Sequence, residues 1–193
     1  MKRLAWLGLL FLLAACSGHT VTTLRLELHT FVPEANRSGS LDVVSGTLRF
    51  PDDDGDNTFG NDPDGYLFSL SDTRGVWEHA SLSARIRLTH QGGGPVTISL
   101  EVHVAPEGNS NIYDGNGDYK VLEKSASLNP GEAAELAPSA TLAPGDPAFD
   151  LLQSGRFRAG VLLSVTGSGS VQYTLEEAVL ALSGKVFRLI PDE

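Results

Sequence analysis

The amino-acid sequence predicts an all-β fold, an antiparallel β-sandwich, and three observations support this prediction. Apolar and polar residues alternate over much of the chain, with the period of two that a half-buried strand requires. Clusters of Gly, Pro, Asn and Asp, which form turns, separate the alternating segments. Segments with helical periodicity are scarce. The chain has 193 residues, which fits about nine or ten short strands in a single sandwich domain.

The clearest strands are residues 80–88 and 96–104, because each places a row of aliphatic side chains on one face. Residues 91–95, Gln-Gly-Gly-Gly-Pro, lie between them and predict a hairpin connection. Residues 167–170, Gly-Ser-Gly-Ser, predict a second hairpin turn. Further strands are expected at residues 21–29, 46–50, 66–70, 121–128, 133–136, 156–165, 171–182 and 185–190, and a short helix at 147–153.

Two finer features follow from the same patterns. Residues 176–182 have helical propensity, but the preceding residues alternate, so a strand with a bulge is expected over 171–182. Arg85 and Arg87 lie on an outward strand face, as do Arg156 and Arg158. We expect these arginines to form cross-strand ion pairs.

Composition excludes some classes of function. The chain has 24 Asp and Glu residues against 14 Lys and Arg, a net charge of −10. This acidic balance argues against nucleic acid as a partner, because the phosphate backbone would be repelled. A single cysteine excludes an intramolecular disulfide and a cysteine-based metal cluster. A hydrophobic content of 41% is sufficient for a packed core.

The first residues have the pattern of a targeting segment. Residues 1–3 carry positive charge, and residues 4–13 form a nearly continuous apolar run. The run is shorter than the roughly 20 residues of a membrane-spanning helix, and it suits a signal peptide. The following quartet, Leu13-Ala14-Ala15-Cys16, resembles the lipobox of bacterial lipoproteins.

This resemblance implies an address and an anchor. The signal peptide would be cut before Cys16, whose thiol would carry a diacylglycerol that binds the protein to the membrane. Ser17 follows the cysteine, which implies sorting to the outer membrane of the bacterial envelope. The expected domains are a lipoprotein signal peptide at 1–15, a lipidated tether at 16–20 and one β-sandwich domain at 21–193. Removal of the two basic residues changes the net charge from −10 to −12.

A second, shorter resemblance concerns the sandwich itself. The turn Leu128-Asn129-Pro130-Gly131-Glu132 stands before a predicted strand. It looks like the turns in immunoglobulin-like modules of bacterial envelope proteins. The resemblance implies an immunoglobulin-like sandwich over about a third of the chain, without the cysteine pair of antibody domains.

Residues 51–64 are the strongest candidate for a metal site. A quarter of the acidic residues lie here, with no Lys or Arg among them. Alternating aspartates point oxygen ligands to one side, as in calcium-binding loops. The match to an EF-hand loop fails, because the sixth position is Asn57 and the twelfth is Pro63. A solvated acidic turn is the alternative. The candidate calcium ligands are Asp52, Asp54, Asp56, Asp62 and Asp64.

Residues 109–119 give a weaker calcium candidate. Asp114, Asn116 and Asp118 alternate, but no carboxylate occupies the twelfth position. A glycine-rich hairpin tip is the alternative. If the two acidic loops emerge at the same end of the sandwich, they form one composite site.

The sequence contains none of the common catalytic motifs, including a Ser nucleophile elbow, a metalloprotease pair and a phosphate-binding loop. Glu101 and His103 share a strand face as a candidate acid–base or metal pair, and a solvated pair of polar residues is the alternative. Trp77, Tyr113 and Tyr119 are candidates for stacking on a sugar. For Trp77 a position in the core is the favoured alternative.

We therefore expect a lipid-anchored, non-enzymatic envelope protein with a binding or structural role. Calcium is a candidate stabilising ion, and a plain solvated acidic loop is the favoured alternative. Its expected partners are the membrane, through Cys16, and an envelope protein or a glycan. One alternative is a carbohydrate- or peptidoglycan-binding module, and another is a hydrolase with an unfamiliar carboxylate site. A solute-capturing lipoprotein is disfavoured, because such proteins are usually larger α/β folds.

Overall fold

A computed structural model of the chain describes residues 21–50, 63–70 and 76–185, with only the backbone described at 42–45. The protein is an all-β antiparallel sheet protein. Its elements are β1 (Thr22–Glu27), η1 (Leu28–Phe31), η2 (Glu34–Asn36), β2 (Ser38–Phe50), β3 (Tyr66–Ser69), β4 (Trp77–Pro106), β5 (Tyr119–Leu128), β6 (Ala133–Leu136), β7 (Ser139–Leu142), α2 (Pro147–Gln153) and β8 (Arg156–Gly184).

Two very long strands organise the sheet. β4 and β8 pair antiparallel over almost their whole length, from Trp77 opposite Gly184 to Pro106 opposite Phe157. β1, β2 and β3 pair with the other edge of β8, whereas β7, β6 and β5 pair with the other edge of β4. The result is a long antiparallel ribbon with β4 and β8 at its centre.

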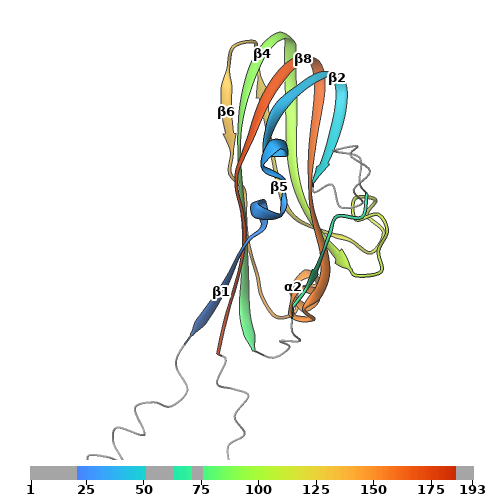
Figure 1. Ribbon diagram of the computed structural model, residues 1–193, viewed down its shortest axis with the longest axis vertical. Helices are drawn as coiled ribbons and strands as arrows, with labels where there is room; N and C mark the ends of the chain where they lie inside the picture. Colours follow the sequence, from blue (N-terminus) through green and yellow to red (C-terminus); the bar gives the residue numbers. More distant parts are fainter. Residues whose placement is uncertain (1–20, 51–62, 71–75, 186–193) are drawn as a thin grey trace, which may run out of the picture.

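The ribbon folds over at glycine-rich corners, where Figure 1 shows β2, β4 and β8 arching together. Gly93 lies opposite Gly169 at this corner, and the register shifts on both sides of it. A Cβ atom on Gly93 would lie 2.6 Å from both the Cα of Gly169 and the carbonyl oxygen of Ser168. Glycine is therefore required where the two backbones approach each other.

The hairpins expected at 91–95 and 167–170 are wrong. Both segments are corners at which one strand continues from one layer into the other. Glycine and an interrupted alternation are common to hairpins and to corners, so the local sequence does not distinguish them. The pairing partner distinguishes a corner from a hairpin, because the two halves of β4 pair with β8 and not with each other.

Folding of the ribbon produces two layers around one core. The first layer contains residues 77–90 of β4 and the second contains residues 96–106, together with the parts of the other strands that pair beside them. Phe50 of the second layer packs edge-on against Tyr173 of the first, with 5.9 Å between ring centroids. Each half of β4 directs every second side chain inward, as the alternation predicts. These buried residues are Ala80, Leu82, Ala84, Ile86, Leu88, Val96, Ile98, Leu100, Val102 and Val104. Each fully buried leucine or valine contributes roughly 1.5–3 kcal/mol to folding.

The helix expected at 147–153 is confirmed as α2. Pro147 occupies the first turn, where its missing N–H is not needed. Ala148, Phe149 and Leu152 are buried, so the helix closes the end of the core opposite the glycine corners. The side chain of Gln153 donates a hydrogen bond of 2.8 Å to the carbonyl of Trp77.

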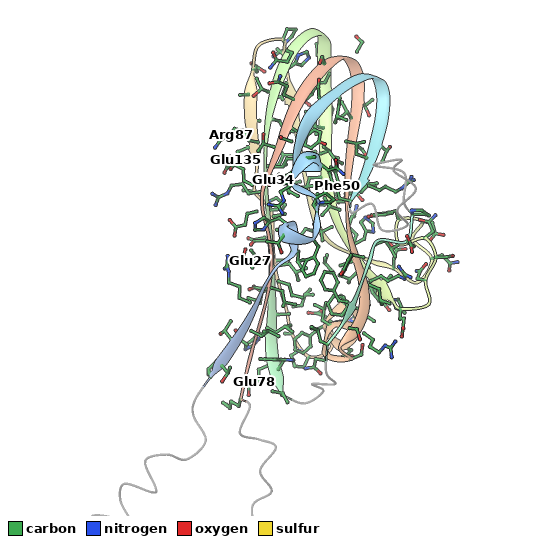
Figure 2. The ribbon with its side chains drawn as sticks, in the orientation of Figure 1. Glu27, Glu34, Phe50, Glu78, Arg87 and Glu135 are labelled. Carbon is green, nitrogen blue, oxygen red and sulfur yellow. The ribbon has the colours of Figure 1, made fainter. Side chains whose placement is uncertain are left out.

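The outer face of the first layer carries the expected ion pairs. Arg85 contacts Glu177 and Glu135 on the two neighbouring strands, and Arg87 contacts Glu176 at 2.7 Å. Figure 2 shows Arg87 and Glu135 on this outer side. The expected bulge is confirmed at Glu176, because Arg85 lies opposite Glu177 and the next residue lies opposite Leu175. Exposed pairs of this kind add little stability individually.

The turn at residues 129–132 packs beside the glycine corner. The backbone N–H of Glu132 donates to the carbonyl of Asn129, and Gly131 has a φ of 83°. A hydrogen bond from the backbone N–H of Asn129 lowers the pKa of the Glu132 carboxyl. Gly131 and Glu132 also bond to the backbone of His90, so this turn is part of the corner.

Other differences from expectation concern strand ends. β1 stops at Glu27, and residues 28–31 form η1. β2 extends from 38 to 50, longer than expected, and β7 was not expected because it alternates over only four residues. Residues 186–190 of the last expected strand lie outside the described residues.

Both ends of the described chain lie at the pole opposite the glycine corners. Thr22, near the first end, lies opposite Gly184, near the last. Gly184 also lies opposite Trp77, where β4 begins, far along the strand from its glycine corner. Within residues 21–50, 63–70 and 76–185, no helix has the length and apolar character needed to cross a membrane.

Candidate functional site

Residues 107–118, between β4 and β5, form a loop that contacts both described ends of the acidic segment. The Tyr113 hydroxyl donates to the carbonyl of Phe50, at 3.3 Å, where β2 ends. The N–H of Ile112 donates to the carbonyl of Pro63, at 2.8 Å. The described ends of one acidic loop therefore lie beside the other acidic loop, the arrangement that a composite site requires.

Asp64 is engaged by Arg158 of β8. The guanidinium Nη1 lies 2.8 Å from Asp64 Oδ2 and donates to the carbonyls of Asp64 and Gly65. Its Nε donates to the carbonyl of Glu107, at 2.8 Å. Arg158 thus joins the two loops and neutralises the one described member of the 51–64 ligand set. Arg156 also forms an ion pair, but its partner, Glu107, lies in the loop and not on a neighbouring strand as expected.

The three alternating residues of the second loop turn in different directions. Asp114 accepts a hydrogen bond of 2.8 Å from the N–H of Asn116, and the carbonyl of Asn116 accepts one from Asn109. Asp118 turns away, toward His103. Across the described residues, no group of three or more His, Cys, Asp or Glu is placed to hold a metal ion. Cys16 and the calcium candidates Asp52, Asp54, Asp56 and Asp62 lie outside those residues.

His103 is buried between two carboxylates. Its Nδ1 lies 2.8 Å from Asp118 Oδ2, and its Nε2 lies 2.9 Å from Glu101 Oε2. The side chain of Asp118 is 2% exposed, and its Oδ1 has no hydrogen-bond partner. Lys120 on β5 lies 3.8 Å from Glu101 and 2.7 Å from Glu123. The favoured prediction, two polar residues on a solvated face, is wrong for His103, which is 6% exposed. The alternative, a pair of Glu101 and His103 in contact, is found, and Asp118 is a third member that the sequence pattern did not predict.

This arrangement favours structural support over catalysis. An aspartate on Nδ1 of a histidine is also the base arrangement of nucleophilic enzymes, where Nε2 faces a hydroxyl or thiol. Here Nε2 faces the Glu101 carboxylate, so the ring has no nucleophile to activate. The network instead fastens the end of the loop, at Asp118, to β4.

The three aromatic candidates have different environments. Trp77 is 7% exposed within the core, so it cannot stack on a ligand. Tyr113 lies between the ring of His103, at 5.2 Å, and the guanidinium of Arg49, at 5.8 Å. Tyr119 is 37% exposed. Of the three, Tyr119 presents the most accessible ring.

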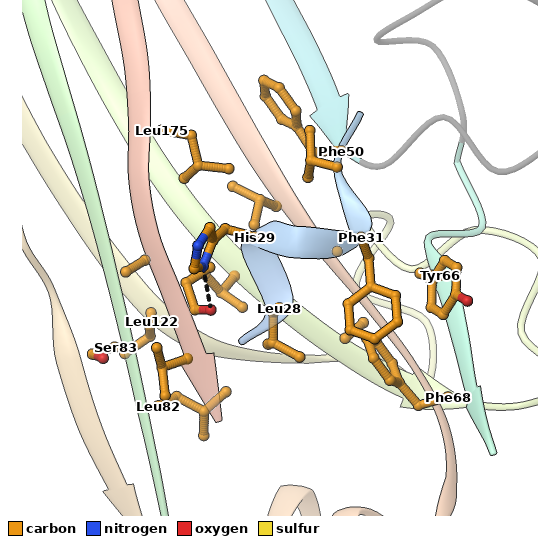
Figure 3. Close-up of a pocket in the computed structure, with 18 residues that line it drawn as sticks. Leu28, His29, Phe31, Phe50, Tyr66, Phe68, Leu82, Ser83, Leu122 and Leu175 are labelled. Atoms are coloured by element: carbon orange, nitrogen blue, oxygen red, sulfur yellow. Dashed lines mark hydrogen bonds between the residues drawn. The ribbon is translucent and has the colours of Figure 1, made fainter. Parts of the chain in front are cut away.

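An apolar pocket opens on the other side of the core, under η1 (Figure 3). It has a volume of about 40 Å³, and both layers contribute to its walls. Phe31 lies at the mouth, 40% exposed, with its ring 4.9 Å from Tyr66 and 5.1 Å from Phe68. A pocket of this size is well below the roughly 300 Å³ of the smallest common ligand sites. Phe31 was not predicted, because it follows the end of the alternating strand.

Comparisons with known proteins give no family. No protein-family model matches the chain, and no curated protein sequence is similar to it. A structure of infectious bursal disease virus, Gx strain, is 7% identical over 89% of this chain, with a TM-score of 0.40. A CBM22-1–GH10 structure of Clostridium thermocellum xylanase 10B is 13% identical over 74%, with a TM-score of 0.33.

A structure of Eiger TNF from S. frugiperda is 15% identical over 61% of this chain and 63% of its own, with a TM-score of 0.29. The chain spans 34% of the viral chain and 25% of the xylanase chain. TM-scores of this size carry no argument about function.

Proposed function

We propose that this protein is a non-enzymatic lipoprotein of the bacterial envelope, anchored through Cys16, with a binding or structural role. The observation that carries the proposal is the N-terminal pattern of basic residues, apolar run and Leu13-Ala14-Ala15-Cys16. It is supported by the position of β1, which begins at Thr22, a few residues after Cys16. The domain would therefore lie close to the lipid surface.

The proposed anchor also gives an orientation. β1 begins at the pole opposite the glycine corners, so these corners would point away from the membrane. From Trp77 to His90, β4 rises about 43 Å at roughly 3.3 Å per residue. The corners are then the part of the protein furthest from the outer-membrane surface, and an envelope partner or a glycan would meet them first.

The immunoglobulin-like character of the sandwich belongs to the same proposal. Its support is the turn at residues 128–132, which has the expected glycine in a left-handed conformation. The continuous strands β4 and β8 differ from the two hairpins that the glycine-rich segments predict. We therefore propose a module with an envelope-type turn and its own strand connections.

The two alternatives have weaker support. A carbohydrate- or peptidoglycan-binding module needs exposed aromatic rings, and burial of Trp77 removes one of the three candidates. A hydrolase needs a reactive group beside a free base, and His103 has both ring nitrogens engaged by carboxylates.

Substitution of Cys16 by serine is expected to release the protein from the membrane, because a hydroxyl does not receive the diacylglycerol. The full gene would be expressed in a didermal bacterium, and membrane and soluble fractions compared with and without detergent. Mass spectrometry of the mature N-terminus would identify the lipid. Ser17→Ala is the matched control and should remain lipidated. Continued lipid modification or unchanged membrane association of Cys16→Ser would contradict the anchor.

Calcium binding at residues 51–64 is a separate proposal, based on the mutual repulsion of closely spaced carboxylates. A chelator is expected to lower the melting temperature, and Ca²⁺ to restore it, while Mg²⁺ restores it less. Combined Asp52→Asn, Asp54→Asn and Asp56→Asn should abolish the response, and Asp150→Asn, at an exposed position of α2 outside both acidic loops, should preserve it. Equal melting temperatures with chelator and with Ca²⁺ would exclude a stabilising site.

A further inference from the structure

We propose that His90 is an acid-sensitive latch that holds the glycine corner closed only while its ring is neutral. His90 is the last inward-facing residue of β4 before the corner, and it is 1% exposed. The inference rests on the geometry of the corner and is independent of the lipid anchor.

Two backbone groups determine which ring nitrogen carries the hydrogen. The N–H of Gly92 donates to Nδ1, at 3.0 Å, so Nδ1 must be an acceptor without hydrogen. Nε2 lies 2.7 Å from the carbonyl of Gly94, which can only accept, so Nε2 must carry the hydrogen. Both bonds together are compatible with the neutral ring alone.

The ring therefore connects two residues of the corner that have no other common partner among its described contacts. Gly92 and Gly94 lie on either side of Gly93, the residue that approaches β8. The ring also packs on β8, because a Cβ atom on Gly169 would lie 2.8 Å from its Cε1. The side chain of His90 thus fills the space between the two strands where both change layer.

The backbone of His90 connects the latch to a third segment. Its N–H donates to the carbonyl of Glu132, at 2.9 Å, and its carbonyl accepts from the N–H of Gly131, at 3.0 Å. Displacement of His90 would therefore disturb the turn at residues 129–132 as well as the corner.

A second proton on the ring breaks this arrangement. The hydrogen would sit on Nδ1 and face the N–H of Gly92, so one hydrogen bond becomes a contact between two donors. The positive charge would also be enclosed where solvent does not reach it. Acid should therefore favour the unfolded chain, in which the ring binds a proton without losing these contacts.

The charged groups around His90 oppose this effect only in part. Glu132, from the neighbouring turn, attracts a positive ring but is itself exposed. On β4 and β8, the nearest charged residues along the strands are Arg87 and Glu176, which pair with each other at 2.7 Å. On β2, Asp42 lies opposite Ser170, and its side chain is outside the description.

Nuclear magnetic resonance of the wild-type full chain tests the proposal without any substitution. Ring nitrogen and backbone amide signals would be followed from about pH 7.5 to about pH 5, the range in which histidine normally titrates. His79, which is exposed on the same strand, is the internal reference. We expect the neutral His90 ring to carry its hydrogen on Nε2, as the contacts with Gly92 and Gly94 require. When acid protonates the ring, the Gly92 and Gly131 amide signals should shift together with its ring nitrogens.

Thermal unfolding of variants gives a second readout. His90→Asn keeps an acceptor near Nδ1 and does not titrate, so its melting temperature should fall several degrees less than that of the wild type over this range. His79→Gln should follow the wild type. Two results would overturn the proposal: protonation of the His90 ring while the Gly92 amide signal is unchanged, or parallel pH dependence of wild type and His90→Asn.

Discussion

Substitution of Gly93 by alanine is expected to destabilise the protein by about 3 kcal/mol or more. The new Cβ would lie 2.6 Å from backbone atoms of Gly169 and Ser168, which cannot move aside as a flexible side chain can. The residue also has a φ of 103°, which side chains rarely adopt. At roughly 2–4 °C per kcal/mol, the melting temperature should fall by about 10 °C.

Gly115→Ala separates backbone strain from steric overlap. Gly115 also has a positive φ, 75°, but a Cβ there would meet no atom within 4 Å. Its replacement should cost only about 1–2 kcal/mol, the conformational part alone. Equal effects of the two substitutions, measured by chemical denaturation, would mean that the corner tolerates a side chain between β4 and β8.

Substitution of Gly160 by alanine is the second large effect, and it should act on the loop at residues 107–118. A Cβ there would overlap the hydroxyl oxygen of Tyr113 and lie 2.9 Å from Ile112 Cδ1 and 3.0 Å from the carbonyl oxygen of Phe50. Tyr113 would have to leave its position over β8 and lose its hydrogen bonds to Phe50 and Val161. We expect a loss of about 2–3 kcal/mol.

A double-substitution cycle would show that Tyr113 is the obstacle. In the Gly160→Ala background, Tyr113→Phe removes the overlapping oxygen, so it should recover part of the lost stability. In the wild type the same change should be destabilising, because it removes a hydrogen-bond donor. Gly108→Ala is the matched control in the same loop, with open space around it, and should change stability by less than about 0.5 kcal/mol. Strictly additive effects would contradict the assignment.

Much of the fold follows from alternation along the sequence. The inward positions of β4 are those that the pattern predicts, because a period of two places alternate residues on one face whichever strand lies beside them. α2 lies where a short helix was expected, and Pro147 fits its first turn. The connection between the halves of β4 is not predictable in this way, since it depends on which distant strand supplies the hydrogen bonds.

The same limit applies to the candidate site: neighbours along one strand can be predicted from the sequence, and contacts between distant segments cannot. Glu101 and His103 lie on one face because they are two residues apart on a strand. In the structure, His103 Nε2 lies 2.9 Å from Glu101 Oε2. Asp118 could not be assigned to them, because its position depends on how the loop returns to β5. For Trp77 the favoured prediction, a position in the core, is confirmed, because the residue is 7% exposed.

The closeness of the two described chain ends has a practical consequence. Thr22 and Gly184 are direct neighbours across a strand pair, so the module begins and ends at almost the same point. A unit of this kind can be inserted into a surface loop of another protein without stretching the host chain. It can also be circularly permuted, with a short linker joining the old ends and new ends opened at an exposed position such as Gly145.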